Sequence, residues 1–289
     1  MNFSMKNKLL GIFQIIVTVF FIYYTLSKIG LNKILEVIKS ADLLFILFAS
    51  IVYFLSQIIS SERLWFILKE NNLIISSKEN IKLYMVGIFY NFFIPGGVGG
   101  DAYKGVLMNK KFQWSLKKIY KLLILDRLIG FGVIICLIIV FSGFILDLEF
   151  ISEFNFILAP LYALLFFFGR VLVQKIFKNE IVYTKAFFIS HIIQILQFGS
   201  IILILLSLGV TNNYFTFLYI FLISSVLSIF SFGGIGIREY VFFTLASNTA
   251  VGPDIATSVG LIFTFSALLS SVPGLFFLIK IKSKKKLST

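Results

Sequence analysis

The chain has 289 residues, of which 59% are hydrophobic and only 13% are charged. A soluble domain of this size carries about 25% charged residues, so the composition excludes a soluble catalytic domain and predicts a protein embedded in a bilayer. The formal net charge is +13. Because the lysines lie in short connections beside apolar segments, we attribute this charge to topology and lipid headgroups, and we expect no nucleic-acid partner.

Long apolar runs predict membrane-spanning helices, because transmembrane strands would alternate polar and apolar residues. We expect an all-α polytopic membrane protein with about seven or eight spans, forming a single domain over residues 1–289. Residues 81–95 and 236–250 are shorter, adjoin glycine clusters, and either cross fully or re-enter from one side. The clear spans are residues 9–27, 43–60, 121–142, 155–174, 186–208, 214–231 and 255–280.

The charge distribution predicts an orientation. Basic residues gather in 101–121, in 170–185 and in the C-terminal tail, whereas 143–153 contains acidic residues and no basic one. The positive-inside rule makes the three basic stretches cytoplasmic and 143–153 external. The basic stretch 28–39 fits less well, because a cytoplasmic N-terminus would put it outside. A reversed start with a complete crossing at 81–95 is the alternative.

The first cluster that could carry function is the segment 91–105. Four glycines and a proline fall within six residues of it, so the helix must break there. At membrane depth, a broken backbone needs protein or a wet cavity around it, and the N–H groups of the next helix then suit an anion such as phosphate. A surface loop is the alternative. The candidate headgroup-binding residues are Asn91, Pro95, Gly96, Gly97, Gly99, Gly100, Asp101 and Lys104.

The second cluster, residues 231–240, repeats the Gly-Gly-aliphatic-Gly pattern of the first one 137 residues later. In both clusters an acid and a base follow within a few positions. Matching glycine-broken segments in two halves of a chain indicate the central site of a transporter, so we interpret the two halves as an internal repeat. The candidate headgroup-binding residues here are Gly233, Gly234, Gly236, Arg238 and Glu239.

Asp126 and Arg127 are ionisable residues inside the predicted span 121–142. Each costs about 2.5–3.5 kcal/mol to insert, so such residues usually face a cavity or a partner. Helical neighbours project about 100° apart and cannot pair face to face. We expect at least one of them to reach another segment, with Glu239 and Lys104 as candidate partners. Snorkelling to water is the alternative.

Other polar residues have simpler interpretations. We interpret Arg63, near Trp65, as an interfacial anchor at the end of the second span, and His191 as a hydrogen-bonding group between helices. One histidine and one cysteine, Cys136, cannot build an ordinary zinc site. The chain has no Gly-x-x-x-x-Gly-Lys-Ser/Thr loop, so we expect no metal, no cofactor and no ATP hydrolysis.

Three stretches, in this order, resemble a known family: residues 94–104, 126–130 and 233–239. They are similar to the flippase-like transmembrane region of lysylphosphatidylglycerol synthases, over almost the whole chain. Two residues depart from the family pattern: Lys104 stands where arginine is usual, and Phe232 where a proline is common. In full-length synthases a soluble C-terminal domain makes the lipid and the membrane region moves it outward. We expect the soluble domain to be absent here.

The residues and the resemblance together predict a lipid flippase in the plasma membrane of a bacterium or archaeon, which moves a phosphate-bearing polar lipid between leaflets. Its partners would be membrane lipids, anionic or linked to a lipid phosphate. Lys104, Arg127 and Arg238 would attract the phosphate. One alternative is a non-catalytic partner of a separate lipid synthase or glycosyltransferase. The other is a membrane-embedded transferase with Asp126 or Glu239 as general base.

Overall fold

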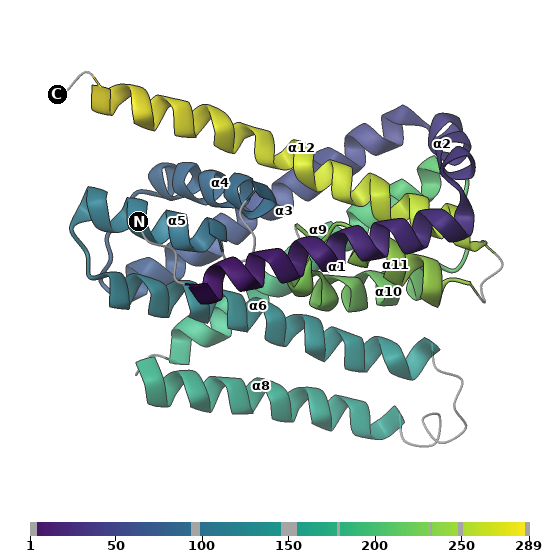
Figure 1. Ribbon diagram of the computed structural model, residues 1–289. Coiled ribbons are helices and arrows are strands. Elements are labelled where there is room, and N and C mark those ends of the chain that lie inside the picture. The colour runs from purple at the N-terminus through teal and green to yellow at the C-terminus, as the bar shows by residue number, and fades with distance from the viewer. Residues whose placement is uncertain are drawn as a thin grey trace.

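The computed structural model describes residues 5–93, 99–145, 155–177, 180–231, 233–247 and 251–286. Regular structure in these residues is entirely helical, which confirms the predicted all-α class (Figure 1). The elements are α1 (Met5–Ile29), α2 (Leu31–Ser40), α3 (Leu43–Glu70), α4 (Ser77–Phe93), α5 (Gly99–Phe112), α6 (Leu116–Ile145), α8 (Asn155–Phe177), α9 (Glu180–Ser207), α10 (Tyr214–Leu227), the short 3₁₀ helix η1 (Ser228–Phe230), α11 (Ile237–Leu245) and α12 (Pro253–Lys286).

Local chemistry explains where two of the long helices begin. The Asp42 carboxylate accepts a hydrogen bond from the Leu44 amide at 2.8 Å, which caps α3. Pro253 occupies the first position of α12, where its missing N–H costs nothing and its fixed φ angle suits a helix. Both helices therefore start at residues that the sequence marks as helix boundaries.

Within the described residues, five helices are long and apolar enough to cross a membrane: α3, α6, α8, α9 and α12. The pair α1 and α2, bent by 83°, would make a sixth. Helix α10 has 14 residues, or roughly 21 Å at about 1.5 Å per residue, which is short of a hydrocarbon core of roughly 30 Å. The prediction of a full span over 214–231 is therefore wrong.

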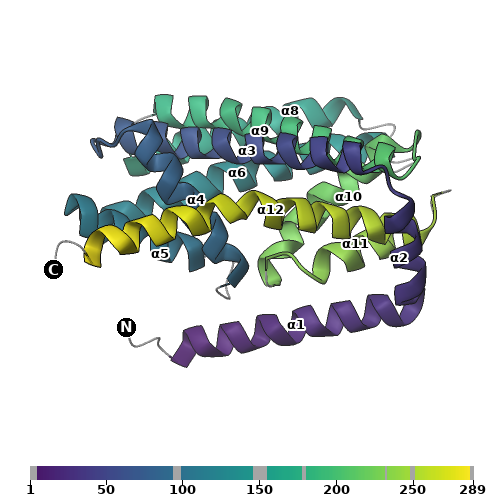
Figure 2. The same ribbon diagram turned by 90° about the horizontal axis from the view of Figure 1, so that it is seen from above.

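Helices α4 and α5, and helices α10 and α11, form two helical hairpins that enter the bundle from opposite ends (Figures 1 and 2). Helix α4 starts at the end where α3 finishes, and α5 returns to that same end. Helix α10 starts at the opposite end, where α9 finishes, and α11 returns there. Of the two alternatives for 81–95 and 236–250, the structure selects re-entry into the bundle for both. Residues 94–98, 232 and 248–250 lie outside the described part.

The repeat extends over the helices as well as the glycine motifs. Helices α3 and α9 both have 28 residues. The starts of α3 and α9, of α4 and α10, and of α6 and α12 are each 137 positions apart. Helices α3 and α9 pack along each other and run in opposite directions (Figure 1). The two halves are thus an inverted-topology repeat, an arrangement that many transporters build around a central site.

Close helix contacts hold each hairpin to the other half of the molecule. Helix α4 packs on α12, and its repeat counterpart α10 packs on α6. On α12, a Cβ atom added at Gly274 would lie 2.2 Å from the carbonyl oxygen of Met85. The absence of a side chain at Gly274 therefore lets the backbones of α4 and α12 approach each other directly.

The first helix covers the second hairpin, and this contact gives a testable prediction. The ring of Phe21 lies 4.5 Å from that of Tyr240. Gly236 has a φ angle of +85°, and a Cβ added there would lie 2.7 Å from the carbonyl oxygen of Thr18. We expect Gly236→Ala to destabilise the protein by about 1–3 kcal/mol and to loosen α1.

Thermal unfolding and limited proteolysis of α1 in detergent measure this effect. Gly132→Ala on α6 is the matched control, because an added Cβ there meets no atom within 4 Å. Equal melting temperatures and equal cleavage of α1 for Gly236→Ala and Gly132→Ala would show that the contact between α1 and the second hairpin contributes nothing.

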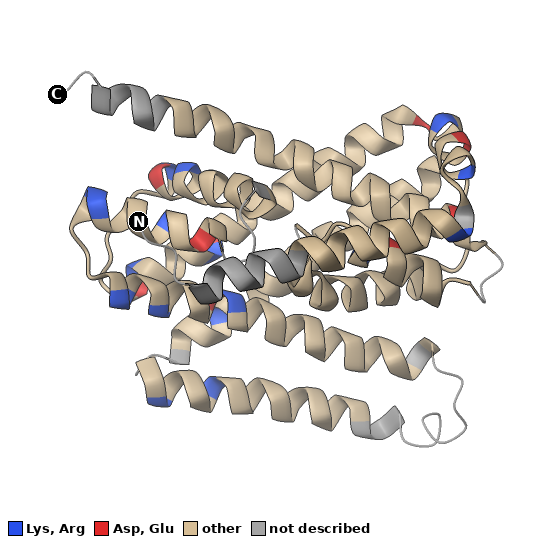
Figure 3. Ribbon diagram, viewed as in Figure 1, with Lys and Arg blue, Asp and Glu red and all other residues tan. Residues whose placement is uncertain are grey.

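Basic residues concentrate at one end of the bundle (Figure 3). The stretches 101–121 and 170–185 meet at this end, and α12 also finishes there, whereas α2 lies at the other end (Figures 1 and 3). The acidic stretch lies outside the described residues from position 146 onward. The basic stretches thus share one end, as a common cytoplasmic side requires, while the cytoplasmic assignment itself stays a prediction.

Candidate functional site

A cavity of about 320 Å³ lies where the two hairpins meet. Its wall includes residues of α3, α4, α5, α6, α11 and α12 and of the segment 228–234. Both glycine clusters therefore contribute to one cavity. Eight of the sequence-predicted residues line it: Asn91, Asp101, Lys104, Asp126, Arg127, Gly233, Gly234 and Arg238. Gly99, Gly100, Gly236 and Glu239 do not line the cavity, and Pro95, Gly96 and Gly97 lie outside the described part.

Glycines bring the two hairpins into contact. Gly233 has a φ angle of +61°, and a Cβ added there would lie 3.0 Å from the Phe92 ring. Within the first hairpin, a Cβ at Gly100 would lie only 1.9 Å from the carbonyl oxygen of Gly87. The Asn91 side chain accepts a hydrogen bond from the Gly100 amide at 2.9 Å, so it satisfies a backbone donor at the start of α5.

Asp101 joins α5 to α6. Its carboxylate accepts a hydrogen bond from Lys104 at 2.9 Å and another from Arg127. The Lys104 ammonium also lies 4.5 Å from the centroid of the Tyr84 ring, a cation–π distance. Asp101 lies on α5, which is not one of the helices long and apolar enough to cross a membrane. Burial disfavours the charged form of Asp101, but Lys104 and Arg127 outweigh burial and hold the pKa of this carboxyl below its ordinary value.

Asp126 pairs with Arg63, which the sequence predicts to lie at the membrane interface. Arg63 donates through Nε to one Asp126 oxygen at 2.7 Å and through a terminal nitrogen to the other at 3.1 Å. A third hydrogen bond, of 2.8 Å, joins Arg63 to Ser190. Arg63 is buried, so its interpretation as an interfacial anchor is wrong. It links α3, α6 and α9 at the cavity wall.

The structure also corrects the expected partners of the intramembrane pair. Asp126 and Arg127 do reach other segments, but the partners are Arg63 and Asp101 instead of Glu239 and Lys104. The physical reason is space on α6: a Cβ added at Gly130 would lie 2.8 Å from the Arg63 guanidinium. The missing side chain leaves room for Arg63 to reach Asp126 from α3.

Arg238 and Glu239 are neighbours on α11 that share one partner, Thr264, and otherwise make different contacts. One Arg238 terminal nitrogen donates to the Thr264 hydroxyl at 3.0 Å, and the guanidinium lies 4.9 Å from the Phe263 ring centroid. One Glu239 oxygen accepts from the Gly236 amide at 2.6 Å, and the other accepts from Thr264 at 2.9 Å. Glu239 therefore caps α11, whereas Arg238 faces the cavity.

His191 lies away from the cavity lining and has a structural partner. Its Nε2 atom lies 2.5 Å from the Tyr162 hydroxyl of α8, and its Nδ1 atom lies 2.9 Å from the Phe187 carbonyl. A carbonyl can only accept, so Nδ1 carries a proton and donates it to Phe187. This contact confirms the interpretation of His191 as a hydrogen-bonding group between helices.

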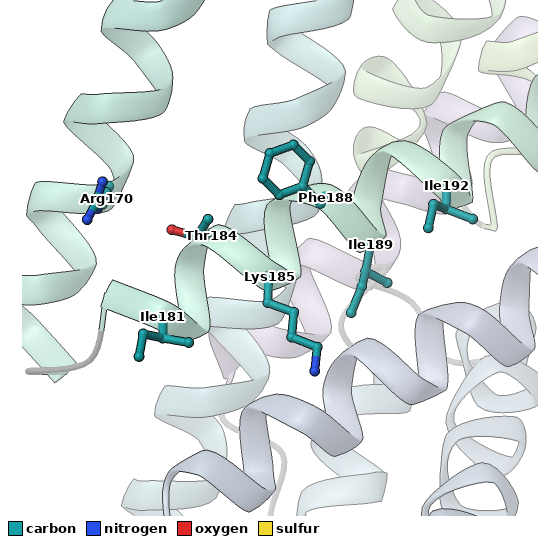
Figure 4. A pocket seen from close by; sticks show the side chains of 7 residues that line it. All are labelled: Arg170, Ile181, Thr184, Lys185, Phe188, Ile189 and Ile192. Carbon is teal, nitrogen blue, oxygen red and sulfur yellow. The ribbon is translucent and has the colours of Figure 1, made fainter.

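A second hollow, of about 510 Å³, runs along α9 beside α8 (Figure 4). It is lined mostly by apolar side chains, and Ile181, Phe188 and Ile192 are exposed. Figure 4 shows Lys185 pointing away from Arg170, toward α3, where it lies 4.3 Å from the Phe66 ring centroid. Among the described residues, no group of three or more His, Cys, Asp and Glu side chains gathers anywhere.

Comparison with known proteins identifies the family of the chain. The family model described as "Lysylphosphatidylglycerol synthase TM region" matches residues 11–274. A protein of Pyrococcus horikoshii described as a UPF0104 membrane protein is 29% identical over 127 residues, which cover 43% of this chain and 37% of that relative. No solved structure matches the chain. Because the family model covers nearly the whole chain, the protein belongs to the family of lysylphosphatidylglycerol synthase transmembrane regions.

Proposed function

We propose that the protein moves a phosphate-bearing polar lipid between the two leaflets of the membrane. The observation that carries this proposal is the single cavity between two hairpins that enter from opposite ends of the bundle, with four basic side chains in its wall. A protein with these features offers a polar headgroup a binding place at the centre of the bundle, between its two ends.

The energetic reason for such a cavity is the cost of desolvation. An ion taken from water into hydrocarbon faces an idealised cost of order 20 kcal/mol, which is too large for spontaneous crossing. Lys104, Arg127 and Arg238 would replace water around the phosphate with charge-assisted hydrogen bonds. The fatty chains would remain outside, against the exposed apolar side chains of helices such as α9.

The two halves of the inverted repeat suggest how the headgroup reaches either side. In transporters with inverted repeats, one half rocks against the other around a fixed central site. Here the hairpins α4–α5 and α10–α11 would open in turn toward their own ends of the bundle. The arrangement supports a transporter over a transferase, because both cavity carboxylates, Asp101 and Asp126, are held in ion pairs and neither is free to act as a base.

The test is a leaflet assay in proteoliposomes with a fluorescent phospholipid in both leaflets and a reductant that bleaches only the outer one. We expect Arg238→Ala to slow exchange about 10-fold to 100-fold, because a hydrogen bond to a charged group contributes about 1.5–3 kcal/mol. Lys175→Ala is the matched control, since it removes one exposed cation of α8 that does not line the cavity.

We expect the control to exchange lipid at the wild-type rate. The proposal fails if wild type, Arg238→Ala and an Arg238→Ala, Asp126→Asn double variant exchange lipid at equal rates. Lipid exchange would then not pass through the cavity. No exchange by any of these proteins, combined with co-purification of a separate synthase or glycosyltransferase, would favour the alternative of a non-catalytic partner.

A further inference from the structure

The charged side chains that line the cavity are unequal in sign. Four are basic, namely Arg63, Lys104, Arg127 and Arg238, and two are acidic, namely Asp101 and Asp126. The sequence of the undescribed residues 94–98 and 232 contains no ionisable side chain. The described wall of the cavity therefore carries an excess of two positive charges.

Hydrogen bonds show where this excess lies. Arg63 and Asp126 form a bidentate pair, which neutralises both. Asp101 is shared between Lys104 and Arg127, so this group of three keeps one positive charge. The second excess charge belongs to Arg238, which has no carboxylate oxygen within salt-bridge distance among the described residues.

Arg238 is buried and incompletely satisfied. Its side chain lines the cavity with 7% of the residue exposed, and its Nε atom has no hydrogen-bond partner in the described part of the chain. Glu239, the next residue, forms no salt bridge with Arg238 among the described residues, and its two oxygens accept from Gly236 and Thr264. Its negative charge acts on Arg238 from outside the cavity wall. A buried guanidinium with an unpaired N–H group costs free energy unless an anion accepts its hydrogen bond and balances its charge.

The two excess charges come from opposite halves of the repeat, one from α5 and α6 and the other from α11. An anion between them would contact both hairpins at once. The cavity of about 320 Å³ has room for about ten waters at roughly 30 Å³ each, which suits a phosphate group with part of its hydration.

We propose that this cavity selects a headgroup with two negative charges on a terminal phosphate, either a phosphate monoester or a diphosphate. A phosphodiester carries one negative charge, and a phosphodiester joined to an amine carries none, so each leaves part of the excess unbalanced. The inference rests on the proposed function and specifies its substrate class. It also separates this chain from a carrier of lysylphosphatidylglycerol, whose two amines and one phosphate give a net positive headgroup.

Equilibrium binding to the purified protein in detergent tests this selectivity. The measurement uses dioctanoyl lipids at pH 8, where a phosphate monoester has lost its second proton, whose pKa is about 6. Dioctanoyl phosphatidic acid is the monoester probe. Dioctanoyl phosphatidylglycerol, phosphatidylethanolamine and lysylphosphatidylglycerol are the comparison lipids.

We expect phosphatidic acid to bind about tenfold or more tightly than phosphatidylglycerol, and the other two lipids to bind more weakly still. Arg238→Gln, which keeps a similar shape without the charge, should reduce the ratio of the first two affinities to about one, while Lys175→Ala should keep it. A wild-type ratio near one, or the tightest binding for lysylphosphatidylglycerol, would overturn the proposal.

Soluble phosphate could offer the same chemistry, so inorganic phosphate and pyrophosphate form a further arm of the experiment. Binding of either one as tightly as phosphatidic acid would assign the cavity to a soluble anion and overturn its assignment to a lipid. The binding result can be distinguished from the transport result. If the protein exchanges lipid but binds phosphatidic acid and phosphatidylglycerol equally, only the charge selectivity is wrong. If it prefers phosphatidic acid but exchanges no lipid, only the flippase function is wrong.

Discussion

Replacing Arg63 with alanine is expected to lower the free energy of unfolding by about 3–5 kcal/mol. The change leaves the Asp126 carboxylate buried among α3, α6 and α9 without its cation, and an uncompensated buried charge is the most costly product of breaking such a pair. The Ser190 hydroxyl also loses its donor. Thermal unfolding of the purified variant in detergent measures the loss.

A double variant separates the ion pair from its surroundings. Arg63→Met with Asp126→Leu removes both charges and fills similar volume, and such replacements are often neutral for stability. We expect this variant to unfold within about 1 kcal/mol of wild type. If the double variant is as unstable as Arg63→Ala alone, then packing at this position, and not charge pairing, holds the three helices together.

Replacing Gly100 with alanine is expected to open the first hairpin and abolish lipid exchange. The added methyl group would lie 1.9 Å from the Gly87 carbonyl oxygen and 2.5 Å from the Asn91 side-chain oxygen. The first of these atoms is backbone, so α4 and α5 must move apart. Overpacking costs about 1–3 kcal/mol and occasionally more. We expect the upper part of this range, together with loss of the Asn91 cap on α5.

The matched control for this variant is Gly199→Ala on α9, where the added Cβ would meet only the Val52 side chain, at an ordinary contact of 3.6 Å. Its melting temperature and its rate of lipid exchange should stay close to those of wild type. If Gly100→Ala has the melting temperature and the lipid-exchange rate of wild type, then the close packing of α4 on α5 is not required for the site.

The sequence predicted the repeat but not its inverted geometry. The spacing of 137 residues between Gly96 and Gly233 reappears in the starts of three pairs of helices, so the internal repeat was visible in the motifs. Hydropathy failed at 214–231 because α10, η1 and the approach to Gly233 form one apolar run. An apolar run of that length does not reveal a chain that turns back inside the bundle.

The pairing of charges could not be predicted from local patterns. Asp126 was expected to reach another segment because an unpaired charge in a span is costly. Its partner depends on where α3 crosses α6 and on the space that Gly130 leaves, and neither follows from sequence spacing. Arg63, close to Trp65, resembled an interfacial anchor, but α3 continues to Glu70 and keeps Arg63 inside the bundle.

The most direct test of a hydrated cavity shared by the two hairpins is the reactivity of single cysteines toward a small, membrane-impermeant thiol reagent. In a Cys136→Ala background, we expect both Ile88→Cys on α4 and Ser228→Cys on η1 to react, because both positions line the cavity. Phe265→Cys, on the exposed outer face of α12, should not react within the membrane. Failure of both cavity positions to react, or reaction of only one of them, would contradict the account.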